Sequence, residues 1–358
     1  MMKHLFKPIL LLLALFLPIV ASAYDFEVDG LYYNKNGTEA TVTYKVLKKT
    51  NYPDTVIIPS TVTYLDTTYS VTTIGESAFE DCSSLRRVVM PNSIQDIQSR
   101  AFMNCSMLYN LSIPSSVKTI GSRAFQNCIR ISSPSLYSVT SIGDMAFYNT
   151  GYWYLYFYNK LTHLGSEAFG HCNISGINVA TNNPVYDSRN NCNAVIETAT
   201  NTLVLGCHKT TIPNTVTAIG DESFDGCEEL SELIIPNSVT YIGSWAFFEC
   251  TNLRNVVIPN SVTTIKNSAF CYCYSLDNVV IPFSVTELGV GAFYGCHSLS
   301  KITIPYSITK IGDGTFTDCY GLTSVTIPNS ITVIDSRAFQ NCRSLTSIDI
   351  PNTVTTLG

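Results

Sequence analysis

The thirteen cysteines of this 358-residue chain are its most prominent candidates for chemistry. Cysteines could form disulfides or, in paired C-x-x-C motifs, bind zinc. Ten of them follow a phenylalanine by three positions, namely Cys82, Cys105, Cys128, Cys172, Cys227, Cys250, Cys273, Cys296, Cys319 and Cys342. A position that holds cysteine in almost every copy of a repeat is typical of packing, where the thiol acts as a small apolar group. We therefore predict ten buried free thiols, with disulfides or a metal as the alternative.

Cys192 and Cys207 lie outside this pattern. Two strand-like runs, 194–197 and 202–205, flank a four-residue turn between them. Folding the chain back at that turn places the two cysteines opposite each other, as cross-strand neighbours that a disulfide could join. One interpretation is a disulfide between Cys192 and Cys207, and the other is two further packed thiols.

The sequence has no arrangement typical of catalysis. The histidines, none of which is spaced from another as a metal ligand, are His4, His163, His171, His208 and His297. The chain contains no nucleophile elbow, P-loop or dinucleotide-binding fingerprint. Acidic residues just before the repeat cysteines, such as Asp225, are interpreted as turn formers on a solvated face. We therefore expect no enzyme activity, no cofactor and no metal site.

A 23-residue repeat organises most of the chain. Clear copies read LRNVVIPNSVTTIKNSAFCYC, LDNVVIPFSVTELGVGAFYGC and LTSVTIPNSITVIDSRAFQNC. Prolines recur at this step, at Pro213, Pro236, Pro259, Pro282, Pro305, Pro328 and Pro351. A period of about 20 to 29 residues with a leucine-led strand is typical of leucine-rich repeats, whose coils stack and bury a continuous core. We predict a leucine-rich repeat solenoid with parallel strands on one face and short helical turns on the other.

Alternation within one copy predicts which side chains face the core. In the copy that begins at Leu253, we expect Leu253, Val256 and Ile258 to point inward and Val257 to point outward. The proline that follows ends the strand, because it has no backbone N–H to donate to a neighbouring strand. Phe270 is predicted to lie in a short helical turn on the opposite side.

The repeats are framed by other segments. Asn36-Gly37 between two alternating runs predicts a hairpin at the start, and the 55 residues from Phe169 to Phe224 contain an insertion. The chain ends in mid-repeat at Gly358, which we interpret as the end of a fragment of a longer protein. We predict a signal peptide at 1–23, an N-terminal β cap at 24–73, leucine-rich repeats at 74–172, a β-hairpin insertion at 173–212 and further repeats at 213–358.

The first 23 residues have the organisation of a secretory signal peptide. Lys3 and Lys7 precede an apolar run at 9–20, and Ala21-Ser22-Ala23 forms a small-residue cleavage site. Removing two lysines changes the formal net charge from −6 to −6 − 2 = −8. An acidic chain does not favour nucleic acid or an anionic membrane as its partner. No second apolar run suggests a membrane span, so we expect a secreted or cell-surface protein.

The repeat unit L-x-x-V-x-I-P-x-S-V-T-x-I-G-x-x-A-F-x-x-C resembles the BspA-like leucine-rich repeat family of bacterial surface proteins, over roughly residues 54–358. This resemblance implies a secreted or surface-displayed scaffold. Members of that family are linked to adhesion to host matrix proteins, to other bacteria and to mucosal surfaces. The resemblance supplies no catalytic residues.

One candidate contact site is the aromatic run 152–158, in which Trp153 precedes Tyr154 and Tyr156. Counting back from Phe169 directs Tyr154 and Tyr156 outward from the strand. Exposed tyrosines suit a protein or glycan partner, because they offer a large contact area at a low entropic cost. In the alternative interpretation, the rings compensate for an irregular 22-residue coil and the neighbouring hairpin covers them.

Ile234, Val257 and Val280 occupy the same outward position in three successive copies. Such an apolar ladder could be a contact surface, or it could reflect the strand propensity of β-branched residues. We predict a noncatalytic scaffold that adheres to an extracellular protein or glycan through the inner face of the solenoid, with an undetermined oligomeric state. The alternatives are a structural spacer or surface-layer component, and a noncatalytic fragment of a larger surface enzyme.

Overall fold

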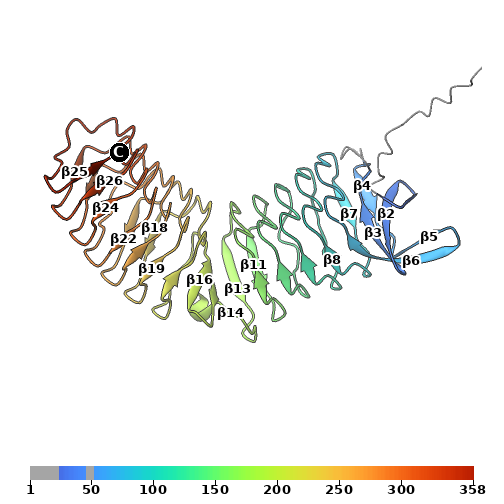
Figure 1. Ribbon diagram of the computed structural model, residues 1–358. Helices are drawn as coiled ribbons and strands as arrows, with labels where there is room; N and C mark the ends of the chain where they lie inside the picture. The colour runs from blue at the N-terminus through green and yellow to red at the C-terminus, as the bar shows by residue number, and fades with distance from the viewer. Residues whose placement is uncertain (1–23, 46–51) are drawn as a thin grey trace, which may run out of the picture.

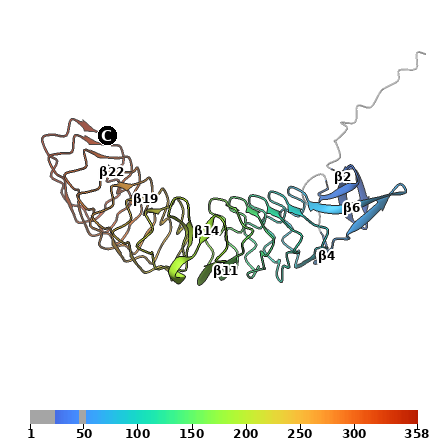
Figure 2. The same ribbon diagram turned by 90° about the horizontal axis from the view of Figure 1, so that it is seen from below.

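The computed structural model describes residues 24–45 and 52–358, and the predicted signal peptide at 1–23 lies outside the described residues. The chain forms an elongated, curved stack of coils that runs from the N-terminal strands to Gly358 (Figures 1 and 2). A leucine-rich repeat solenoid is therefore the correct fold class, and its coils pair through parallel strands.

Each regular coil has three sides, which we call the long-strand side, the short-strand side and the turn side. In the coil around residue 260, β20 (Asn255–Val257) lies on the first side and β21 (Thr264–Ile265) on the second. In the regular copies a proline follows the long strand, as Pro259 follows β20, and a Ser/Thr-rich corner leads to the short strand. Both strands pair in parallel with their counterparts in the previous coil, so that equivalent residues stack.

The strands divide between two sides of the stack. The short-strand side contains β8 (Asp96–Ile97), β9 (Thr119–Ile120), β10 (Ser141–Ile142), β12 (His163–Leu164), β17 (Ala218–Ile219), β19 (Tyr241–Ile242), β21, β22 (Glu287–Leu288), β24 (Lys310–Ile311), β26 (Val333–Ile334) and β27 (Thr356–Leu357). The long-strand side contains β4 (Thr55–Ile57), β7 (Arg87–Val89), β11 (Tyr154–Phe157), β13 (Gly176–Val179), β18 (Glu232–Ile234), β20, β23 (Lys301–Thr303) and β25 (Ser324–Thr326).

The turn side is built from hydrogen-bonded turns, so the short helical turns predicted from the sequence are not found there. In one coil, Cys271 N donates to Ser268 O, but Ser268 and Tyr272 have φ of 54° and 60°. An α-helix needs φ near −63°, so these residues cannot continue one. Phe270 N instead donates to Ala292 O of the next coil at 2.8 Å. The one helix in the described residues is the 3₁₀ turn η1 (Arg189–Asn191).

A column of stacked phenylalanine rings fills the core. Phe270 is fully buried, with its ring centroid 5.0 Å from that of Phe247 and 5.3 Å from that of Phe293. The column runs from Phe79 to Phe169 and again from Phe224 to Phe339. The break between Phe169 and Phe224 separates two hydrophobic clusters, so the stack has two core blocks with a junction between them.

The repeat cysteines line this column as hydrogen-bond donors. Cys273 Sγ donates to Phe247 O at 3.2 Å, and seven other thiols donate to the equivalent carbonyl at 3.0–3.2 Å. Seven of these eight carbonyls also accept a backbone N–H and Phe147 O accepts the Thr150 hydroxyl, so each thiol adds a bond between one coil and the previous one. Nine of the ten repeat cysteines are buried, as predicted, and none of the ten forms a disulfide in the structure, while Cys227 is partly exposed.

Antiparallel strands lie at the N-terminal edge of the stack (Figure 1). β2 (Leu31–Asn36) pairs with β1 (Phe26–Val28) and with β3 (Glu39–Thr43), and β3 pairs in parallel with β6 (Thr67–Ile74). β5 (Thr61–Tyr64) forms a hairpin with β6. The turn after β2 consists of Gly37 and Thr38, one residue later than Asn36-Gly37, and the positive φ of Gly37 suits a two-residue hairpin loop.

The insertion lies inside the stack. β14 (Tyr186–Asp187) pairs with β15 (Val195–Glu197), which pairs antiparallel with β16 (Thr202–Leu205). β16 then pairs in parallel with β17, so it takes the place of a short strand between the two core blocks. On the turn side the insertion supplies only Gly206, whose N–H donates to Ser223 O at 2.7 Å. A side chain on Gly206 would collide with the Phe224 ring, so glycine is the residue that fits at this position.

Candidate functional site

The long-strand side alternates between buried and exposed positions, as the sequence predicts. In β11, Leu155 and Phe157 are buried, whereas Tyr154 and Tyr156 point outward. In β20, Val256 is buried and Val257 is exposed. Outward side chains on this side can vary without disturbing the core, so they can form a contact surface.

The aromatic patch, which comprises Trp153, Tyr154, Tyr156, Tyr158 and Tyr137, is open to solvent. The exposed fractions of Trp153, Tyr154 and Tyr156 lie between 38 and 58 %, so the insertion does not cover them. Asn178 donates to the Tyr154 hydroxyl at 2.8 Å, and the Tyr158 ring contacts those of Tyr156 and Tyr137. These contacts hold the rings of the patch in place.

The predicted ladder of Ile234, Val257 and Val280 is present and extends further. The three side chains follow one another on successive coils, and the structure adds Phe283 and Tyr306 beside them. We call these five residues the apolar strip, and their exposed fractions lie between 66 and 80 %.

Phe283 and Tyr306 are contact candidates that the sequence prediction missed. They flank a cleft of about 620 Å³ that Val280 and Lys301 also line. Both residues directly follow a repeat proline, where other copies have an asparagine, for example Asn260. Comparing this position across the copies would have found them, because an aromatic in place of an exposed asparagine has no role in the core.

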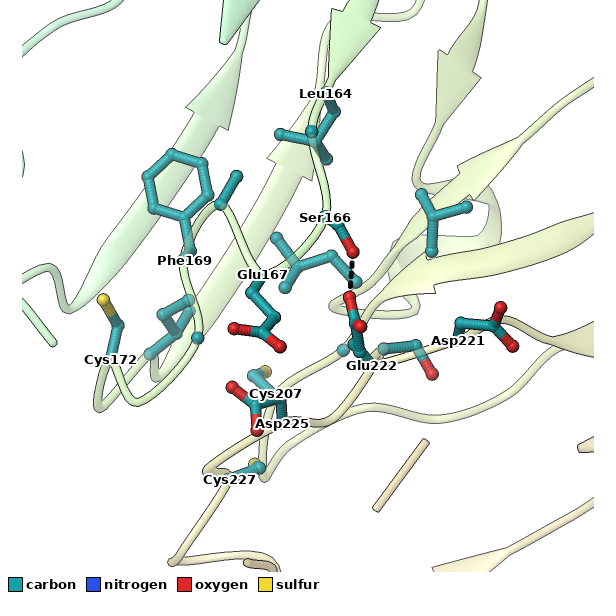
Figure 3. A pocket seen from close by; sticks show the side chains of 18 residues that line it. Leu164, Ser166, Glu167, Phe169, Cys172, Cys207, Asp221, Glu222, Asp225 and Cys227 are labelled. Carbon is teal, nitrogen blue, oxygen red and sulfur yellow. Dashed lines mark hydrogen bonds between the residues drawn. The ribbon is translucent and has the colours of Figure 1, made fainter. Parts of the chain in front are cut away.

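A second cavity, of about 250 Å³, opens on the turn side at the junction of the two core blocks (Figure 3). In a regular coil Phe147 N donates to Ala168 O, but at the junction Gly206 takes the place of Phe169 as the donor to Ser223 O. The two turn segments on either side are therefore joined less closely than regular coils. Glu167 comes from one of them, and Glu222 and Asp225 come from the other (Figure 3).

Burial perturbs three of the four carboxyl groups that line this junction pocket. Burial, together with repulsion from neighbouring carboxylates, raises the pKa of Glu222 to about 7 and that of Asp225 to about 8. Burial also raises the pKa of Glu167. The Asp225 side chain is only 4 % exposed, with one oxygen 3.7 Å from His171 Nε2 and the other without a hydrogen-bond partner. Asp225 does lie in a turn, but the prediction of a solvated face is wrong, because its carboxylate is buried.

The cysteines of the junction pocket are poorly suited to nucleophilic chemistry. Burial raises the pKa of its cysteines, to about 11 for Cys172, so their thiols stay protonated and are poor nucleophiles. Within residues 24–45 and 52–358, no three histidine, cysteine, aspartate or glutamate side chains are grouped to hold a metal ion. The arrangement of carboxylates makes the pocket sensitive to pH.

Cys192 and Cys207 are free thiols in the structure, which therefore does not contain the disulfide between them. The register of β15 and β16 shifts by a bulge between Val195 and Ile196, which alters how the segments before and after the hairpin face each other. Cys207 Sγ donates to Asn193 O at 3.4 Å, and Cys192 has a separate partner. Both are buried, as the packed-thiol alternative predicts.

Comparison with known protein families identifies the family of this chain. A family model described as the BspA type leucine-rich repeat region, in six copies, matches residues 47–187, 205–320 and 264–358. The chain belongs to the BspA-type leucine-rich repeat family. No curated protein matches this BspA-type protein in sequence.

Solved structures share its fold. A leucine-rich cell surface protein from Faecalibacterium prausnitzii is 26 % identical, with a TM-score of 0.64 over 91 % of this chain and 98 % of that one. A leucine-rich repeat protein from Bacteroides ovatus is 28 % identical, with a TM-score of 0.58 over 92 % and 84 %. The pneumococcal vaccine antigen PcpA, 18 % identical with a TM-score of 0.64 over 92 % of both chains, shares the fold alone.

The described part of this BspA-type protein includes no helix with the length and hydrophobicity that crossing a bilayer requires.

We expect all thirteen thiols of this BspA-type protein to be free and most to be unreactive in the native state. Burial raises the pKa of Cys82 and Cys271 to about 12, so little reactive thiolate forms at neutral pH. Titration with Ellman's reagent without reductant checks this. The native chain should react slowly, and the chain in guanidinium chloride should show thirteen thiols. A count of 13 − 2 = 11 after denaturation would instead support the disulfide between Cys192 and Cys207.

Proposed function

We propose that this protein is a noncatalytic binding scaffold, exported to the cell surface or secreted, that adheres to an extracellular protein or glycan through its long-strand side. The observation that carries the proposal is the apolar strip, in which five apolar side chains on four successive coils are exposed to solvent. A row of this kind is typical of an interaction surface. The solved neighbour from Faecalibacterium prausnitzii, itself described as a cell surface protein, supports the location.

The geometry of the strip suits a partner that covers several coils. Val257 pairs directly with Ile234 across parallel strands, so their side chains lie side by side on a rigid support. Phe283 and Tyr306 border the 620 Å³ cleft and can act as aromatic anchors, which often dominate binding energy. The aromatic patch, around Tyr154 and Tyr156, lies on the same side and provides a second contact area.

Binding of the exported chain, residues 24–358, to a panel of matrix proteins and mucin glycans tests the proposal. We expect saturable binding that the double variant Phe283→Asn/Tyr306→Asn weakens by about 100-fold, since loss of each anchor should cost about tenfold or more. Asparagine is the residue that other coils use at this position, so the fold should be retained. The control is Asn92→Ala, which truncates the equivalent exposed side chain of a distant coil.

A Tyr154→Ala/Tyr156→Ala variant locates the contact if the strip is not responsible. Loss of binding in this variant alone would move the site to the aromatic patch. A folded chain that binds no member of the panel would contradict adhesion and favour a structural spacer, which needs no ligand of its own.

A further inference from the structure

The turn side of the second core block contains a hollow that neither the repeat pattern nor the long-strand side explains. It has a volume of about 380 Å³ and lies across five successive coils. Trp245, Tyr272 and Tyr294 come from three of these coils, and Asp313 with Arg337 forms the far rim. We call it the turn-side hollow.

Two glycines create the space. Each coil has a residue with positive φ at the first turn of this side, and Trp245, Ser268 and Arg337 occupy that position in three coils. In the two coils between Ser268 and Arg337 the position is held by Gly291 and Gly314. A Cβ on either glycine would meet no atom closer than 3.3 Å, so the missing side chains leave open room. The backbone conformation does not require glycine here, since the other coils place side chains on it.

Aromatic rings form the wall of the hollow and support one another. The Trp245 ring is exposed and packs against Phe248 with centroids 5.0 Å apart. Phe248 in turn contacts Tyr272 at 5.6 Å, and Tyr272 contacts Tyr294 at 5.3 Å. These edge-to-face contacts fix the ring orientations, so a ligand meets a rigid aromatic surface.

The opposite rim is polar but neutral overall. Arg337 Nε donates to Asp313 Oδ1 at 3.1 Å and Arg337 Nη2 donates to Asp313 Oδ2 at 2.6 Å. The two charges therefore neutralise each other, while the outer donors of the exposed guanidinium stay accessible. Gln340 adds an exposed amide beside them.

The backbone around the hollow is already paired. Gly291 N donates to Asp313 O and Gly314 N donates to Ser336 O, each within the ladder between coils. An extended peptide that binds by adding a strand needs free backbone groups, and these donors are not free. The ligand must therefore be recognised by ring faces and side-chain polar groups.

We propose that the turn-side hollow binds a neutral carbohydrate. A pyranose ring has an apolar face of C–H groups, which can lie on the ring of Trp245, and a rim of hydroxyls. Those hydroxyls can bond to the Asp313–Arg337 pair and to Gln340, which offer both donors and acceptors. Because the charged pair is internally neutralised, the site favours an uncharged sugar over an acidic one. This site lies on a different side of the coil from the apolar strip and is independent of it.

Tryptophan fluorescence can report on the site directly. The chain has two tryptophans, so Trp153→Phe leaves Trp245 as the single reporter. We would titrate this variant of the exported chain with cellotetraose, maltotetraose and tri-N-acetylchitotriose, with a hyaluronan tetrasaccharide as the acidic comparison. At least one neutral sugar should give a saturable change in Trp245 emission, with calorimetry returning the same affinity, and hyaluronan should bind at least tenfold more weakly.

Two variants test the geometry. Trp245→Ala, followed by calorimetry, should weaken sugar binding at least tenfold. Gly314→Arg should do the same by filling the hollow, with a side chain that Arg337 already carries at the equivalent position. Met145→Arg, which places the same side chain at the equivalent position of a distant coil, is the matched control and should bind normally. Equal binding by the Gly314→Arg and Met145→Arg variants would overturn the proposal.

Other outcomes also decide it. Failure of all three neutral sugars to bind a folded chain would overturn the assignment to carbohydrate. The same holds if Trp245 emission changes with a phenylalanine- and tyrosine-containing peptide but with none of the sugars. Sugar binding that Phe283→Asn/Tyr306→Asn removes and Gly314→Arg leaves intact would place the glycan on the apolar strip. That result would support the proposed function and overturn the present inference.

Discussion

Phe270→Ala is expected to lower the free energy of unfolding by about 3–5 kcal/mol, the usual range for removing a buried aromatic ring. The Phe270 ring is fully buried between Phe247 and Phe293 in the column that joins the coils. Its loss removes ring contacts on both faces and leaves a cavity that the stacked backbones, held by bonds such as Phe270 N to Ala292 O, cannot close. Urea denaturation followed by circular dichroism measures the change.

Phe283→Ala is the matched control, because it makes the same substitution in the next coil at an exposed site. We expect it to change the free energy of unfolding by no more than about 0.5 kcal/mol. Contacts in a solenoid are mainly between neighbouring coils, so the Phe270 variant should also separate unfolding into two transitions. Equal effects of the two substitutions would show that the ring column does not dominate stability.

Positions that recur with every coil could be assigned from the sequence. The burial of Leu253 and Val256 and the exposure of Val257 follow from strand alternation, and all three agree with the structure. The repeat cysteines could be assigned to the interior for the same reason, because their position is filled similarly in each copy. Their bond to the phenylalanine carbonyl of the previous coil could not be foreseen, since it depends on how the coils stack.

The turn side was predicted less well because its conformation is not encoded in hydrophobic spacing. Residues such as Ser268 and Trp245 adopt positive φ although neither is a residue type that signals it. The turn-side hollow therefore has no local signature beyond two glycines. The surroundings of Asp225 could not be predicted from the sequence either, because Glu167 belongs to the coil before the insertion and comes close to Asp225 only in the folded chain.

The junction pocket should make stability depend on pH. We expect the free energy of unfolding to be higher at pH 5 than at pH 8.5, by on the order of 3 kcal/mol. In the folded chain the pKa of Glu222 is about 7 and that of Asp225 about 8, against ordinary values of 4.5 and 3.8. The folded state thus holds more protons than the unfolded state between about pH 4 and pH 8. Stability is fully present below pH 4 and is lost as the pH rises through the folded pKa values.

The ionisable groups that face one another here are Asp144, Glu167, His171, Asp221, Glu222, Asp225 and Glu249. Acidic groups outnumber this histidine and Arg123, which faces Glu167, so ionisation adds repulsion where the phenylalanine column is broken. We therefore expect the two core blocks to separate first at this junction at high pH, which hydrogen exchange of the amides around Gly206 can detect.

Asp225→Asn isolates the buried carboxyl group. Asparagine has nearly the same shape but no charge, so the variant should be more stable than the natural chain at pH 8.5 and should lose most of the pH dependence. Asp349→Asn, at an exposed carboxyl group far from the junction, makes the same chemical change and should leave the pH profile unaltered. A natural chain whose stability rises from pH 5 to pH 8.5 would contradict the assignment, because that slope requires carboxyl groups whose pKa is lowered by folding.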